Sequence, residues 1–260
     1  MNIDPVLIGY GAIVGLSLGL TDSGGSILTI PLLVYGAGLP MQRALIISLF
    51  IVASIAAFGA ARQTLSKQID WHAAILFSAT GMVISPLVVA WTHDVNETLR
   101  LSLFAILMLV VAWRMASRSP RCLQNNGYGQ VPAGIIRIGL GGGLAGALAG
   151  FFGVGGGFII VPLLVIIFAM PYAQAVGTSL ASIAMISSAA LIGHFINGVA
   201  LDLTMLPNFI GGGMLGLLLG IAAMNKVPER IAKLSFAAIT ASLAIYMLID
   251  KLYLLQGGAL

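Results

Sequence analysis

Two glycine-rich interruptions in strongly apolar sequence hold the residues best suited to chemistry. The first runs Asp22-Ser23-Gly24-Gly25-Ser26, and the second contains Gly153 and Gly155-Gly156-Gly157. Paired glycines permit positive φ and close approach, so that successive backbone N–H groups can form a concave nest for an anion. A short helix beginning at such a break adds free N–H groups and the positive end of its dipole. These residue types indicate anion binding, although glycines can also serve only close helix packing.

Asp22 makes the two interruptions unequal, because it stands where the second one has Gly153. An ionisable group at membrane depth is costly and marks function by default. Asp22 is therefore a candidate proton carrier, neutral while the anion is bound and charged otherwise. Two alternatives stay open. Its carboxylate could cap the following helix by accepting N–H groups of Ser23–Ser26, or the break could lie near the membrane surface.

Other polar side chains follow the interruptions along the chain. Ser48 and Ser179 occupy equivalent positions 131 residues apart, and Thr178 precedes Ser179. Their hydroxyls could bind an oxyanion or could bond back to their own helices. His194, near the end of an apolar run, could move a proton or could interact with a helix dipole.

The composition indicates an all-α polytopic membrane protein. Of 260 residues, 59% are hydrophobic and 8% are charged, whereas soluble domains carry about 25% charged residues. The mean hydropathy is +1.07. A spanning helix needs about 20 apolar residues, and apolar runs of roughly this kind occupy positions 41–61, 71–91, 98–113, 172–193, 203–222 and 231–249.

The chain repeats itself at an offset of 131 residues. From 11 to 44, 11 of 34 positions are identical to their counterparts, and most of these are Gly or Pro. The sequence therefore predicts two repeats, each a broken helix pair followed by three transmembrane helices. The broken segments are 6–37 and 133–169. The predicted organisation is an N-terminal repeat over 1–116, a cytoplasmic linker over 117–132 and a C-terminal repeat over 133–260.

The distribution of Lys and Arg favours an inverted arrangement of the two repeats. If each broken segment is re-entrant, nine of the 12 Lys and Arg residues lie inside and three outside. If each broken segment crosses the membrane once, the division becomes seven and five. Positive residues concentrate in cytoplasmic loops, so we expect inverted repeats with both termini outside the cytoplasm. Two helix starts related by such a pseudo-two-fold would form one anion site near mid-membrane.

The motifs resemble the TauE/SafE sulfite exporter family. The resemblance rests on Gly155–Leu164 with Ala175–Leu180, and on a weaker first copy from Ser23 to Leu33 with Ser48-Leu49. It implies a transporter of small sulfur-containing anions, such as sulfite, a sulfonate or thiosulfate, in the bacterial inner membrane. Some members are linked to other small organic anions. Asp22 departs from the second copy and argues against two equal nests.

These observations predict a secondary active exporter that works by alternating access, with protons as the coupling ion and a small anion as the substrate. An anion channel, or a transporter of a non-sulfur organic anion, stays open as an alternative, as does a homodimer. We expect no enzymatic activity, because His72, His93 and His194 lack the partners that HExxH or GxSxG motifs would supply. No Walker A motif occurs, and Cys122 is the single cysteine. We therefore expect no cofactor, no metal site and no nucleic-acid partner.

Overall fold

The structure is a computed structural model of the 260-residue chain. It describes residues 4–21, 25–66, 68–92, 95–117, 135–155, 157–168, 170–196, 205–224 and 229–257. These residues form helices and short connections, without a β-strand. The helices are α1 (Pro5–Thr21), α2 (Gly25–Pro31), the π-helix η1 (Leu32–Gly36), α3 (Met41–Leu65), α4 (Trp71–Trp91), α5 (Glu97–Ser117), α6 (Ile135–Phe152), α7 (Gly157–Phe168), α8 (Tyr172–Ile196), α9 (Leu206–Met224) and α10 (Glu229–Gly257).

The predicted all-α membrane fold is confirmed. Each of the six apolar runs forms a single helix, and four helices are long and apolar enough to cross a membrane, namely α3, α4, α8 and α9. In α5 and α10, charged residues stand at the first turn before the apolar stretch. Trp71 and Trp91 lie at the two ends of α4, where an interfacial aromatic belt would place them.

Both predicted breaks are present, and each divides its segment into a long helix and a short one. In the first half α1 ends at Thr21 and a helical segment runs from Ser26 to Gly36. In the second half α6 ends at Phe152 and α7 begins at Gly157. The short elements differ in form, because the chain becomes a π-helix after Pro31 but remains α-helical through the equivalent Pro162.

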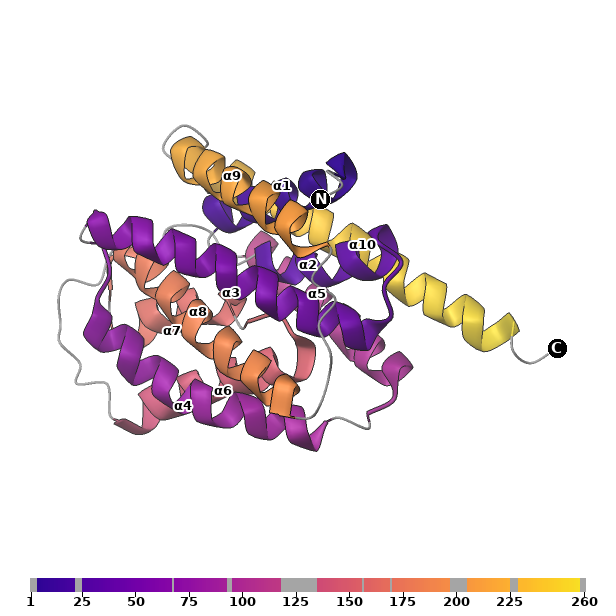
Figure 1. The fold of residues 1–260 in the computed structure, drawn as a ribbon, viewed down its shortest axis with the longest axis horizontal. Helices are drawn as coiled ribbons and strands as arrows, with labels where there is room; N and C mark the ends of the chain where they lie inside the picture. The colour runs from indigo at the N-terminus through magenta and orange to yellow at the C-terminus, as the bar shows by residue number, and fades with distance from the viewer. Residues whose placement is uncertain are drawn as a thin grey trace.

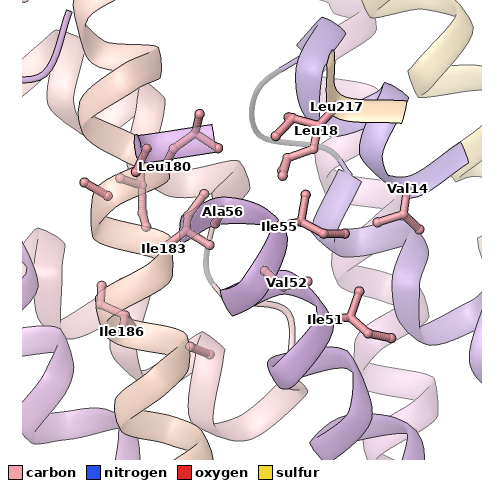
Figure 2. Packing of buried hydrophobic residues seen from close by; sticks show 14 of the residues in the cluster. Val14, Leu18, Ile51, Val52, Ile55, Ala56, Leu180, Ile183, Ile186 and Leu217 are labelled. Atoms are coloured by element: carbon pink, nitrogen blue, oxygen red, sulfur yellow. The ribbon is translucent and has the colours of Figure 1, made fainter. Parts of the chain in front are cut away.

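Helices α3 and α8 form the centre of the bundle. Over their apolar windows both are 72% buried, whereas α4 and α9 are 39% buried. Figure 1 shows α1 and α9 together on one side of this pair, and α4 and α6 together on the other. In Figure 2, Ile51 and Ile55 of α3 face α1, while Val52 and Ala56 lie toward Ile183 of α8.

Glycine stripes on α1 and α6 let these helices pack closely against their partners. A Cβ added to any of these glycines would collide with a backbone carbonyl of the neighbouring helix. Gly11, Gly15 and Gly19 meet the carbonyls of Phe209, Gly213 and Leu217 on α9, while Gly142, Gly146 and Gly150 meet those of Phe77, Gly81 and Ser85 on α4. The close-packing interpretation of these six residues is confirmed.

The contacts between the two halves have a matching pattern. At the offset of 131 residues, α1 corresponds to α6 and α4 to α9, and the contact of α1 with α9 has its counterpart in that of α6 with α4. The contacts of α3 with α8 and of α5 with α10 each join an element to its own counterpart. This pattern is what a pseudo-two-fold would produce. The inversion of the repeats relative to a membrane stays a prediction.

Helix α5 fastens the beginning of α3 and the end of α6. The Met41 N–H donates to Oε1 of Glu97 at 3.0 Å, which satisfies a free donor at the start of α3. One turn later, the buried Arg100 donates to the Thr92 carbonyl. Its guanidinium lies 5.6 Å from the centre of the Phe151 ring. The residues before the second break are thus held at this end of the bundle.

Candidate anion-binding site

The two short helices begin beside each other. Gly157 is the first residue of α7, and Ser26 lies in the first turn of the Ser26–Gly36 segment. A Cβ added to Gly157 would lie 3.3 Å from the Ser26 hydroxyl oxygen. Gly157 and Ser26 are equivalent in the repeat, so the helix starts meet where the two halves are related. The sequence predicted this meeting, and the geometry agrees with it.

This meeting point lies at the middle of the two central helices. Val52 of α3 and Ile183 of α8, which are equivalent in the repeat, both contact the position of a Cβ added to Gly155. Each is 11 residues from the start of its helix and 13 from the end, so it lies about 17 to 20 Å from either terminus at 1.5 Å per residue. If α3 and α8 span the membrane, the site lies near half depth.

Two buried hydroxyls without hydrogen-bond partners define the polar part of the site. Ser26 Oγ and Ser187 Oγ are fully buried, and neither has a partner in the structure. A Cβ on Gly155 would lie 2.6 Å from Ser187 Oγ, so this hydroxyl faces the second break just as Ser26 does. An unsatisfied buried hydroxyl costs about 1 to 3 kcal/mol. A ligand that accepts from both hydroxyls would remove this cost.

The second break requires glycine at two positions. Gly153 and Gly155 have φ values of +68° and +72°, in the left-handed region that other residues rarely adopt. At Gly153 a Cβ would also lie 3.0 Å from the Cα of Leu45. A single left-handed residue before a helix turns successive N–H groups toward a common point, which is the geometry of an anion nest. This part of the predicted nest has the backbone form expected of it.

Ser48 holds the second break against α3. Its Oγ lies 2.6 Å from the Gly153 carbonyl and 2.7 Å from the Leu45 carbonyl of its own helix. Ser179 Oγ likewise donates to the Val176 carbonyl at 2.7 Å. Bonding back to the helix, one of the two alternatives left open by the sequence, is therefore what these hydroxyls do in this structure.

Thr178 and His194 lie away from the meeting point. Thr178 Oγ1 accepts the Asp70 N–H at 3.0 Å and so joins α8 to the beginning of α4. His194 is in the last turn of α8, about 10 Å along the helix axis from Ser187 at 1.5 Å per residue. The substrate role of Thr178 and the proton role of His194 stay predictions.

Several residues predicted from the first interruption lie outside the described residues. These are Asp22, Ser23 and Gly24, together with Gly156 of the second interruption. Gly25 begins α2. The roles assigned to all five stay predictions. Among the described residues, no group of three or more His, Cys, Asp or Glu side chains could hold a metal ion.

Ser187 is the site residue that the sequence analysis missed. It sits within a helix predicted to span, where a serine normally bonds to its own backbone. One signal was available, since the repeat places Ala56 at the equivalent position of α3. The same kind of mismatch drew attention to Asp22.

The arrangement can bind a small anion by donation alone. The first N–H groups of an α-helix have no acceptor within the helix, and at α7 these are the groups of Gly157–Ile160. The Ser26 and Ser187 hydroxyls add two donors to the same region. Around them the side chains of Val52 and Ile183 are apolar.

Comparison with known proteins agrees with a membrane transporter. The family described as "Sulfite exporter TauE/SafE" matches residues 7–247. A probable membrane transporter protein of Xylella fastidiosa is 29% identical over 249 residues, covering 94% of each chain. One from Methanocaldococcus jannaschii is 27% identical over 266 residues, covering 94% of this chain and 95% of its own. No solved structure is a significant match.

Proposed function

This chain belongs to the TauE/SafE sulfite exporter family, and we propose that it is a secondary active transporter that exports a small sulfur-containing anion. The proposed location is the bacterial inner membrane. The proposed binding site is the meeting point of the α7 start with Ser26 and Ser187. The further residues Ser23, Gly24, Gly25, Gly153, Gly155 and Gly156 would complete its backbone lining.

The observation that carries this proposal is the pair of buried hydroxyls without partners. Ser26 Oγ comes from the first half and Ser187 Oγ from the second, yet both face the second break. A transporter with alternating access needs a site between two elements that can move relative to each other. A ligand bound by one hydroxyl from each half would sense any such movement.

Asp22 supplies the proposed coupling to protons. It directly precedes the first short helix in sequence, so its charge would oppose an anion bound at the helix start. Protonation would remove this repulsion, and binding of proton and anion would become linked. Transport in one direction would then follow the proton gradient.

The test is uptake of sulfite into proteoliposomes that contain the purified protein, with and without an imposed pH gradient. We expect uptake that depends on the protein and increases with the gradient. Uptake that ignores the gradient would indicate an anion channel and would contradict the coupled mechanism. Uptake of lactate in place of sulfite and sulfonates would contradict the assignment of a sulfur substrate.

The Asp22→Asn variant tests the coupling residue. We expect it to lose the response to the pH gradient while it keeps a wild-type unfolding temperature. Asp4→Asn is the matched control, because Asp4 is an exposed carboxylate at the start of α1. A pH-gradient response in Asp22→Asn equal to that of Asp4→Asn would exclude Asp22 as the coupling residue.

A further inference from the structure

The candidate site is surrounded by segments without a cationic side chain. Residues 21–36, 44–61, 152–168 and 172–196 contain no Lys and no Arg. These four segments supply both breaks, both short helices and the middle of both central helices. Positive charge at the site must therefore come from the backbone.

The buried arginine at the end of the bundle has a different position and different partners. Arg100 contacts the Thr92 carbonyl and the Phe151 ring. Glu97, one turn earlier, bonds to Met41, which lies about 16 Å along α3 from Val52 at 1.5 Å per residue. Arg100 thus belongs to the end of the bundle rather than to its middle.

The backbone can balance about one negative charge. A helix N-terminus acts as roughly half of a positive elementary charge. The α7 start and the start of the Ser26–Gly36 segment together supply about one such charge. The Ser26 and Ser187 hydroxyls are neutral donors, which orient an oxyanion but add no net charge.

A second negative charge on the ligand would have no partner. The cost of moving an ion out of water rises with the square of its charge, so a dianion pays about four times as much as a monoanion of equal size. At a fully buried site this difference is not screened by solvent. Val52 and Ile183 around the breaks offer apolar surface rather than compensating charge.

We infer that the site selects monoanions with a pyramidal oxyanion group, such as hydrogensulfite and organosulfonates, and rejects dianions such as sulfate. This inference rests on the proposed function and adds the charge of the substrate to it. One consequence concerns protons, because sulfite would bind as hydrogensulfite and carry a proton with it. Binding of sulfite would then decrease as the pH rises and hydrogensulfite loses that proton, whereas binding of a sulfonate would not.

The test compares two anions of similar size and shape, methanesulfonate and sulfate, for binding to the purified full-length protein. We expect methanesulfonate to bind at least roughly 100-fold more tightly than sulfate, because an uncompensated buried charge is strongly unfavourable. Sulfite should bind more weakly at high pH, and methanesulfonate should bind equally across the same range. Equal affinity for sulfate and methanesulfonate would overturn the inference.

Serine variants locate the site in the same assay. Ser187→Ala and Ser26→Ala should each weaken methanesulfonate binding by roughly 10-fold, the value of a hydrogen bond to a charged group. Ser188→Ala is the matched control, because Ser188 is exposed and donates to the Ala184 carbonyl of its own helix. Unchanged binding in both Ser187→Ala and Ser26→Ala would overturn the assignment of this site.

Transport measurements separate the inference from the function on which it rests. Proteoliposomes that take up sulfite, together with protein that binds sulfate as tightly as methanesulfonate, would leave the exporter function intact and disprove the charge selection. Proteoliposomes that move neither sulfite nor methanesulfonate would contradict the proposed function itself, and the inference would fall with it.

Discussion

At the scale of single residues, the second break depends on glycines that no other residue can replace without strain. Gly155 has φ +72°, and a Cβ there would lie 2.6 Å from Ser187 Oγ. Gly155→Ala should therefore lose about 1 to 3 kcal/mol of stability and should displace the Ser187 hydroxyl. We expect a lower unfolding temperature in detergent and a lower rate of sulfite uptake.

Gly211→Ala provides the comparison for Gly155→Ala. A Cβ at Gly211 in α9 meets nothing within 4 Å, and alanine favours a helix over glycine by about 1 kcal/mol. This variant should keep or raise the unfolding temperature and should transport normally. Equal behaviour of the two variants would show that the left-handed backbone at Gly155 is unimportant.

The sequence predicted the glycine positions better than the hydroxyl positions. Gly155 could be identified because a glycine pair before a short helix has few structural explanations. Ser187 could not, because the burial of a hydroxyl and the absence of its partner depend on neighbours far away in sequence. Gly155 and Ser187 are 32 positions apart, and only the folded chain brings them together.

At the scale of elements, hydropathy predicted the spans and left their local form undecided. The run 71–91 became α4 with the same bounds, since turn residues and a capping Asp70 mark its start. The π-helix after Pro31 had no such signal. Both halves contain Pro-Leu-Leu-Val at this point, so the difference must come from packing rather than from local sequence.

The beginning of α3 is the element whose anchoring is easiest to test. Glu97 Oε1 accepts the Met41 N–H and also places a negative charge near a helix N-terminus. Glu97→Ala should lower stability by about 1 kcal/mol through the lost hydrogen bond. Glu97→Gln keeps an acceptor and should lose only the charge contribution, about 0.3 to 1 kcal/mol. Thermal unfolding of both variants measures the order, and a larger loss in Glu97→Gln would contradict it.

At the scale of the whole molecule, the repeat predicted which helices pair. Glycines at a spacing of four in α1 and α6 required close neighbours, and the folded chain supplies them from α9 and α4. The sequence could not say which helix would be the neighbour, because any helix with a matching surface satisfies a glycine stripe. The central position of α3 and α8 likewise follows from the assembled bundle, since their apolar character does not distinguish them from α4 and α9.

The orientation of the bundle is the remaining prediction at this scale, and the single cysteine makes it testable. If the repeats are inverted, Cys122 lies in the cytoplasmic linker and the C-terminus lies outside, because nine of the 12 Lys and Arg residues then face the cytoplasm. A membrane-impermeant maleimide should therefore fail to label Cys122 in intact spheroplasts and should label it after permeabilisation. The control is a Cys122→Ser protein with a cysteine added after Leu260, which should be labelled without permeabilisation. Protection of both cysteines in intact spheroplasts would place both on the cytoplasmic side, which requires each broken segment to cross the membrane fully and would end the inverted arrangement.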